Sequence, residues 1–174
     1  MHYPQSQEAT LAFNTILEEL LMEPIYKTWF VNLNLISGAC YVLLYSTKDG
    51  IQTLRGSFGS LLPVQDNLYN EICDNARSAA FYDSNFSPVQ PEEIEDLFVA
   101  VDVVEPLESI DNVSELDTKV YGVMVERGLK KGVVFPNIEG IDTPEKQLSL
   151  AFQKAGLKPD ESVKLSRFKI VRYF

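Results

Sequence analysis

The sequence predicts an α+β protein whose strands form a largely antiparallel sheet. Two pairs of strand-like segments are joined by short turns, which is the pattern of β-hairpins. Helix-like segments do not follow each strand in turn, so the strict alternation of a parallel, doubly wound fold is absent. With 174 residues, 45% of them hydrophobic, the chain is long enough for one compact domain or two intimately packed lobes.

Helical spacing of apolar residues predicts three long helices and one short one. They cover residues 8–22, 66–81, 91–97 and 143–155. Pro24 ends the first helix, and Gly156 stops the last one. Segment 25–37 is apolar and weakly periodic, so it can hold a short strand, in which Trp29 packs rather than binds.

The predicted strands comprise two hairpins, a central strand and a last strand. The hairpins are 38–45 with 51–57, joined by an Asp-Gly turn, and 120–126 with 131–136. In the valine-rich strand 98–104, Asp102 falls on the face opposite Val99, Val101 and Val103. Residues 163–174 form a last strand, and the acidic, irregular loop 106–118 is the predicted boundary between lobes.

Charge is distributed unevenly along the chain. Residues 1–120 contain 5 Lys and Arg against 19 Asp and Glu, whereas residues 121–174 contain 10 against 6. An acidic bulk argues against nucleic-acid binding, because phosphate neutralisation supplies most of that affinity. The basic last third can form one local anion-attracting patch. The sequence shows neither a membrane span of ~20 apolar residues nor the features of a signal peptide, so we expect a cytoplasmic protein without membrane contact.

The rare residues exclude most standard catalytic sites. The only histidine, His2, lies at the N-terminus, so a Ser-His pair, a Cys-His pair and zinc ligation are not expected. Cys40 and Cys73 are predicted to be reduced core thiols. The phosphate-binding P-loop and the dinucleotide glycine motif are missing, and acidic runs such as 92–96 are interpreted as solvated faces. We therefore expect no metal and no cofactor.

A glycine-containing segment with a scarce positive charge precedes the second helix. It reads Leu54-Arg55-Gly56-Ser57-Phe58-Gly59, and residues 1–120 contain only one other arginine. In one interpretation, backbone amides converge on an anion while Arg55 supplies a forked donor for carboxylate or phosphate. In the other, the glycines fit a bulge and Arg55 pairs with one of the many acids. The sequence leaves both interpretations open.

Several separated segments resemble one family, the AMME chromosomal region protein domain, called AmmeMemoRadiSam system protein A in prokaryotes. Residues 54–59 stand where the family has Leu-Arg-Gly-Cys-Ile-Gly. Residues 76–88 are similar to its Ala-Ala-Phe-x-Asp-x-Arg-Phe-x-Pro stretch. Further matches are Glu92-Glu93-Ile94, Tyr121-Gly122 in place of the usual His-Gly, 132–136 and 154–157.

The resemblance implies a single domain over residues 1–174, built of two unequal α/β subdomains with a cleft that residues 54–60 border. It also implies association with a Memo-type protein, similar to extradiol dioxygenases, and with a radical S-adenosylmethionine enzyme. Three departures remove reactive groups: Ser57 replaces a cysteine, Tyr121 a histidine and Asn85 an arginine. A serine hydroxyl stays protonated and needs a base, unlike a low-pKa thiolate.

We therefore expect the chain to bind a small anionic ligand or a protein partner at this cleft, as an accessory to those two proteins. The alternative is an enzyme acting on a small carboxylate- or phosphate-bearing substrate, with Ser57 or Tyr121 as a catalytic hydroxyl. The expected ligand-binding residues are Arg55, Gly56, Ser57, Gly59, Asn85 and Tyr121.

Overall fold

The structure is a computed structural model that describes residues 3–25 and 30–174, and it divides into two compact units. The first unit holds the chain up to Val104 together with the last segment, Val171–Phe174. The second unit is Glu105–Ile170. Each unit has its own four-stranded sheet and its own hydrophobic core, so each is described by itself.

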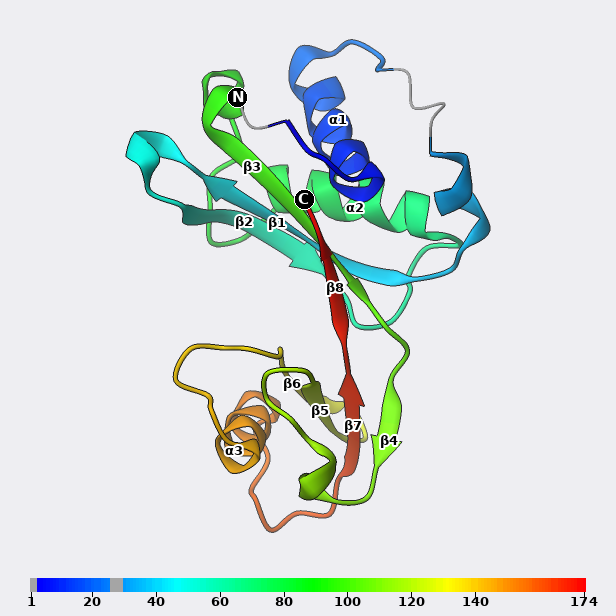
Figure 1. Cartoon of the computed structure of the whole chain (residues 1–174), viewed down its shortest axis with the longest axis vertical. Helices are drawn as coiled ribbons and strands as arrows, with labels where there is room; N and C mark the ends of the chain where they lie inside the picture. Colours follow the sequence, from blue (N-terminus) through cyan, green and yellow to red (C-terminus); the bar gives the residue numbers. More distant parts are fainter. Residues whose placement is uncertain (1–2, 26–29) are drawn as a thin grey trace. The chain divides into compact units, whose positions relative to one another are not determined.

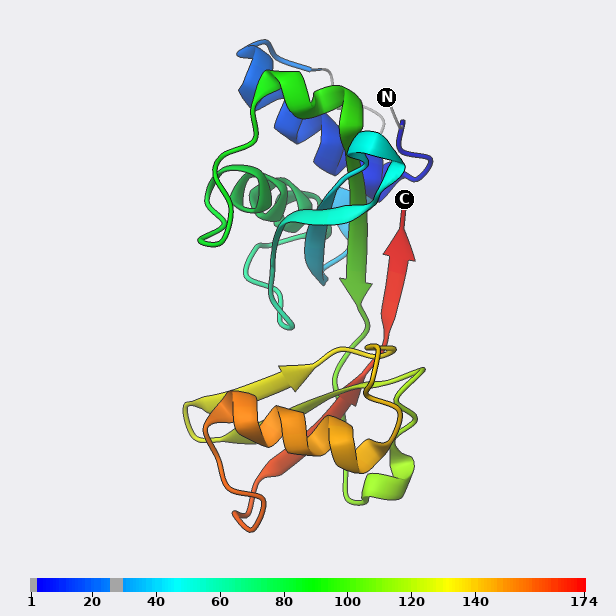
Figure 2. The ribbon, with the colours of Figure 1, turned by 90° about the vertical axis from the view of Figure 1, so that its left-hand side faces the viewer.

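The first unit is a sheet covered on one face by two helices (Figures 1 and 2). Its strand order is β2-β1-β3-β8, which leaves β2 and β8 at the edges. The strands are β1 (Ala39–Ser46), β2 (Thr53–Gly59), β3 (Leu97–Val104) and β8 (Ile170–Tyr173). The helices are α1 (Gln7–Leu21) and α2 (Leu68–Phe81), with short 3-10 helices η1 (Val31–Leu35), η2 (Lys48–Gly50) and η3 (Pro91–Asp96).

Polar caps and apolar stripes explain where these two long helices form. The Ser6 hydroxyl accepts a hydrogen bond from the backbone of Ala9, and the Asn67 side chain does the same for Asn70. The buried stripes of both helices pack against the inner face of β1 and β3. This core includes Leu11, Phe13, Ile16, Val42, Leu44, Ile72, Ala76, Val99 and Val101.

The second unit places one helix against a smaller antiparallel sheet (Figure 2). The strands are β4 (Glu108–Ile110), β5 (Gly122–Arg127), β6 (Lys130–Val134) and β7 (Lys164–Phe168), in the order β4-β7-β5-β6. Helix α3 (Pro144–Ala155) starts at Thr143, whose side chain accepts from the Lys146 amide, and ends at left-handed Gly156. A 3-10 turn, η4 (Val113–Glu115), follows β4.

The predicted α+β class with antiparallel strands is confirmed, as are the long helices and both hairpins. Three expectations were wrong. The described part of segment 25–37 forms η1 rather than a strand, and Trp29 lies outside the described residues. Loop 106–118 contains β4 and η4. The last strand is two strands, β7 and β8, which belong to different sheets.

Asp102 lies on the face opposite Val99 and Val101, as predicted for strand 98–104, and it is only 1% exposed. Arg172 on β8 donates two hydrogen bonds of 2.6 Å to it. The neighbouring strand therefore supplies the partner that a buried carboxylate requires.

Candidate functional site

The segment Leu54–Gly59 lies inside edge strand β2 and is not a turn. Along β1, Leu44 pairs with Gly56 while the next residue, Tyr45, pairs with Leu54. Arg55 is therefore the extra residue of a β-bulge, which bends an edge strand and redirects a side chain. The segment thus contains a bulge, but it lies at Arg55, whereas Gly56 and Gly59 pair in register with Leu44 and Tyr41.

Close backbone packing explains both glycines of this segment. A Cβ atom on Gly56 would lie 2.3 Å from the carbonyl oxygen of Ala79 in helix α2. A Cβ atom on Gly59 would lie 2.3 Å from the carbonyl oxygen of Cys40 on β1. No side chain fits at either distance, so the two glycines let β2 approach its neighbours.

Arg55 makes a forked ion pair with Glu93 of η3. Its Nε donates to Glu93 Oε2 at 2.6 Å, and its Nη2 donates to Oε1 at 2.9 Å. The side chains are 14% and 35% exposed. Hydrogen bonding to Arg55 holds the pKa of Glu93 below its usual value, and the same bond raises the pKa of Arg55. Glu93 was expected on a solvated acidic face, so that expectation was wrong for this residue.

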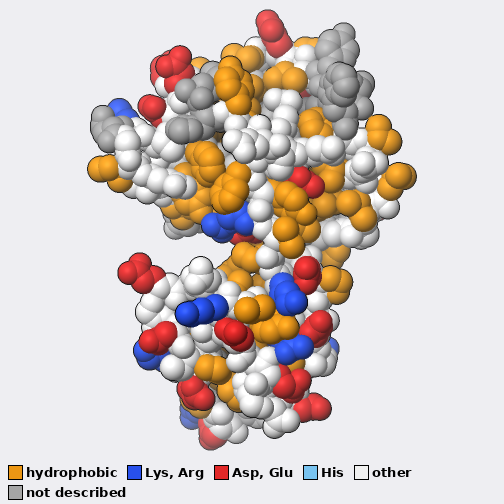
Figure 3. Space-filling model, in the orientation of Figure 1, with side chains coloured by type: hydrophobic (Ala, Val, Ile, Leu, Met, Phe, Trp, Pro, Cys, Tyr) orange, Lys and Arg blue, Asp and Glu red, His pale blue; other side chains and the backbone are white. Residues whose placement is uncertain are grey.

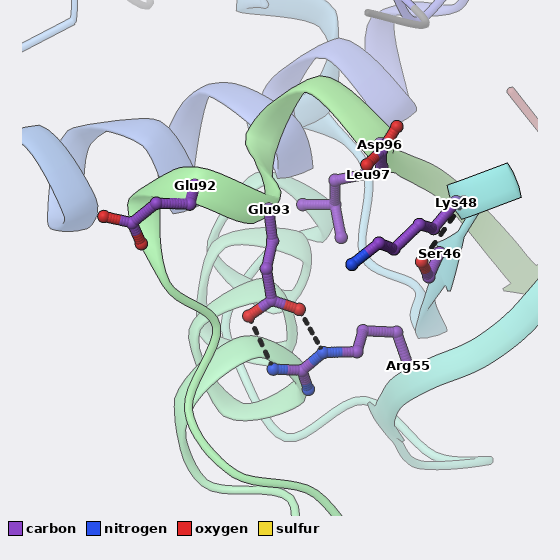
Figure 4. Close-up of a pocket in the computed structure, with 7 residues that line it drawn as sticks. All are labelled: Ser46, Lys48, Arg55, Glu92, Glu93, Asp96 and Leu97. Carbon is purple, nitrogen blue, oxygen red and sulfur yellow. Dashed lines mark hydrogen bonds and ion pairs between the residues drawn. The ribbon is translucent and has the colours of Figure 1, made fainter.

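A pocket of about 340 Å³ adjoins this ion pair. It is lined by Ser46, Lys48, Arg55, Glu92, Glu93, Asp96 and Leu97. Figure 4 shows the Lys48 ammonium directed toward the Arg55–Glu93 pair, whereas the Glu92 and Asp96 carboxylates point away from it. Among the side chains that the structure describes, Lys48 makes no ion pair, and its charge adds to the lowering of the Glu93 pKa.

Lys48 was missed by sequence reasoning, because it lies in the turn of the first hairpin and matches no binding motif. The signal that could have found it is the scarcity of cations: residues 1–120 contain only five. The hairpin register returns β2 alongside β1, which places the turn lysine and the bulge arginine around one pocket.

Ser57 and Asn85 both donate to the carboxylate of Asp83. The Ser57 amide donates to Asp83 Oδ2 at 2.8 Å, and the Asn85 amide donates to Oδ1 at 2.8 Å. These backbone bonds hold the pKa of Asp83 below its usual value, with Asn85 as the largest cause. The Asp83 carboxylate therefore already accepts a hydrogen bond from the Ser57 amide, one of the amides that were expected to bind an anion. An ionised carboxylate with a lowered pKa is also a poor base for the Ser57 hydroxyl.

Tyr121 belongs to the second unit and is described there. It precedes β5, is half-buried, and has the Arg167 guanidinium 4.2 Å from its ring centre. Of the six expected ligand-binding residues, only Arg55 lines the pocket. Ser57 and Asn85 are joined through Asp83, and Tyr121 lies beside Arg167 in the second unit.

The remaining predictions from the sequence concern thiols, metals and membranes. Cys40 and Cys73 are buried thiols, as predicted, and burial raises the pKa of Cys40 to about 12. Among the described residues, no group of three or more His, Cys, Asp or Glu side chains could hold a metal ion. None of the described helices combines the length and apolar character needed to cross a bilayer.

These features define a class of protein: a two-unit α+β chain with an Arg-Gly-x-x-Gly edge strand beside a charged pocket. The AMMECR1 family model matches residues 6–173, nearly the whole chain. The protein belongs to the AMMECR1 family, which confirms the resemblance that its separated motifs indicate.

Relatives and a solved structure agree with this membership. A protein of Thermotoga maritima is 46% identical over 134 residues, covering 76% of this chain and 75% of that protein. A Clostridium acetobutylicum protein, CA_C1420, is 41% identical over 120 residues, which cover 69% of this chain and 25% of that longer protein. The crystal structure of the uncharacterized protein PH0010 from Pyrococcus horikoshii is similar with a TM-score of 0.81 and 26% identity, covering 95% of this chain and 88% of PH0010.

Proposed function

We propose that the protein binds a small ligand carrying a carboxylate or phosphate group in the pocket beside Arg55. The observation that supports this most is the Lys48 ammonium, which is directed toward the Arg55–Glu93 pair and makes no ion pair with any side chain that the structure describes (Figure 4). Glu93 pairs with Arg55, and the carboxylates of Glu92 and Asp96 point away from this pair, so Lys48 supplies the positive charge available to a ligand.

Donors remain available for such a ligand. A guanidinium carries five N–H donors in a planar fork, and Glu93 engages one at Nε and one on Nη2. The ion pair fixes the plane of Arg55, so little side-chain entropy is lost when the remaining donors meet a ligand. An anionic group held by Lys48 and Arg55 would accept charge-assisted hydrogen bonds, which are stronger than neutral ones.

The size of the pocket suits a small metabolite. Its volume of about 340 Å³ lies at the lower end of the range for small-molecule sites. Leu97 supplies an apolar wall, and the carboxylates of Glu92 and Asp96 stand at the rim. These acids disfavour a large polyanion, so the proposed ligand carries a single anionic group on a compact body.

The proposal includes a cytoplasmic, accessory role beside a Memo-type protein and a radical S-adenosylmethionine enzyme. Membership of the AMMECR1 family supports this part, because the resemblance to that family implies the association. Affinity purification from the native cell should recover a partner in stoichiometric amount. A product that is consistently monomeric and free of partners would contradict the accessory role.

An enzyme acting in the same place is the alternative. Ser57 would need a base, and the carboxylate that its own amide contacts, Asp83, is engaged by backbone amides. The geometry therefore favours binding over hydroxyl-based catalysis by Ser57.

A ligand-observed NMR screen tests the binding proposal. Small carboxylates and phosphate monoesters are screened against the wild type and Lys48→Met. Loss of one charge-assisted contact should weaken the best ligand by about tenfold or more. Lys146→Met is the matched control, because Lys146 is exposed and already paired with Asp142 in the second unit. Failure of every compound to bind the wild type, or equal binding by Lys48→Met, would overturn the proposal.

A further inference from the structure

We propose a second oxyanion-binding site, formed by Tyr121, Arg167 and Lys169 in the unit Glu105–Ile170. It uses no residue of the Arg55 pocket and does not depend on the function proposed for that pocket. Its ligand is a phosphate or carboxylate group. One aromatic ring, two cations and one missing counter-charge point to this site.

Strand register brings the three side chains together. Gly122 pairs with Phe168 at the end of the β5–β7 ladder, so the next residues, Tyr121 and Lys169, face each other beyond it. Arg167 and Lys169 are two positions apart on an extended chain and point to the same side. The Arg167 guanidinium carbon lies 4.2 Å from the centre of the Tyr121 ring, and the Lys169 ammonium lies 5.3 Å from it.

Among the described residues, Arg167 has a carboxylate partner and Lys169 has none. Arg167 donates from Nε to Glu108 Oε2 at 2.8 Å and from Nη1 to the carbonyl oxygen of Glu115 at 2.7 Å. These two bonds fix the guanidinium over the ring, and its side chain is 23% exposed. Arg167 is therefore held in place with Nη2 still available.

Lys169 is a half-buried ammonium without a counter-charge among the described residues. The other lysines of this unit are exposed, and some of them pair with carboxylates. Figure 3 shows acidic and basic side chains interspersed over the surface of the unit. Removing an ammonium from water costs free energy unless a partner compensates. The face of the Tyr121 ring compensates in part through a cation–π contact, and an anionic ligand would add charge-assisted hydrogen bonds.

The chemistry of the cluster selects the class of ligand. Lys169 Nζ and Arg167 Nη2 offer hydrogen-bond donors only, and the Tyr121 hydroxyl, which has no partner among the described side chains, can donate as well. A ligand that only accepts hydrogen bonds and carries negative charge satisfies all three groups. Phosphate and carboxylate oxygens have this property, whereas an amine or a metal cation would meet like charge.

A titration of the full-length protein with inorganic phosphate tests the site by ¹H–¹⁵N NMR at constant ionic strength, with acetate as a second arm. Saturable shifts at the amides of Tyr121, Arg167 and Lys169, with phosphate or with acetate, are the expected result. Lys169→Met should weaken this binding by about tenfold or more, and Tyr121→Phe should weaken it while keeping the ring. A chloride titration corrects for general screening.

Lys154→Met is the matched control, since Lys154 is an exposed lysine of the same unit on helix α3. It should bind phosphate as the wild type does. The proposal is overturned if neither anion gives saturable shifts, or if Lys169→Met, with its amide spectrum still dispersed, binds as tightly as Lys154→Met.

Discussion

Gly56→Ala should destabilise the first unit, because the added methyl group meets backbone. Its Cβ would lie 2.3 Å from the Ala79 carbonyl oxygen, whereas ordinary contacts begin at 3.4 Å. Strand β2 and helix α2 must therefore separate by about 1 Å, which disturbs the packing on Leu44 and Ala79. Overpacking of this kind costs about 1–3 kcal/mol, and we expect the upper end because a carbonyl group cannot change rotamer.

Urea unfolding followed by circular dichroism measures this loss, and native-state hydrogen exchange assigns it to the first unit. Gly38→Ala is the control in the same unit, because its Cβ would find Leu68 at an ordinary 3.5 Å. That variant should stay within about 0.5 kcal/mol of the wild type. If Gly56→Ala is as stable as Gly38→Ala, then close packing does not explain the glycine of the motif.

Three further predictions concern charges and thiols. The pKa of Glu93 is lowered in the folded state, so the stabilisation by ionised Glu93 should be complete above about pH 4.5 and lost as pH falls through the lowered pKa. The measurement is the difference in unfolding free energy between wild type and Glu93→Gln from pH 2 to 7, and this difference should shrink toward low pH. Cys40 and Cys73 should react with a thiol reagent at pH 8 only in urea, and fast reaction of the folded protein would contradict their burial. Arg172→Met should cost about 3–5 kcal/mol at pH 7, because it leaves the Asp102 carboxylate buried and unpaired; a loss below about 1 kcal/mol in urea unfolding would refute this role.

Local signals in the sequence were sufficient for most elements of the fold. Proline, the capping residues and the Asp-Gly turn mark the ends of helices and the first hairpin, and these signals act over a few residues. The strand of residues 51–57 was predicted, but its bulge was not, because glycine and serine have low strand propensity and give no signal for its position. Only the pairing of Leu44 with Gly56 and of Tyr45 with Leu54 places the bulge at Arg55.

Side-chain partners that lie far apart along the chain could not be predicted from the sequence. Arg55 was expected to bind an anion or to pair with an acid, but nothing local selects Glu93, 38 positions away, from the many carboxylates of the chain. Alternation placed Asp102 on an outer face, yet the sheet order brings β8 and its arginine beside it. These partners depend on strand order and loop path, which single-sequence periodicity does not encode.

The most direct test of the central claim is to observe the Lys48 ammonium itself. Reductive ¹³C-methylation gives each lysine an NMR signal, and the signal of Lys48, assigned by comparison with Lys48→Met, is followed while the best carboxylate or phosphate ligand is added. We expect the Lys48 signal to shift and the shift to saturate as the ligand is added, while the Lys146 signal stays in place. Saturable binding that leaves the Lys48 signal unmoved would contradict the assignment of the anion to this pocket.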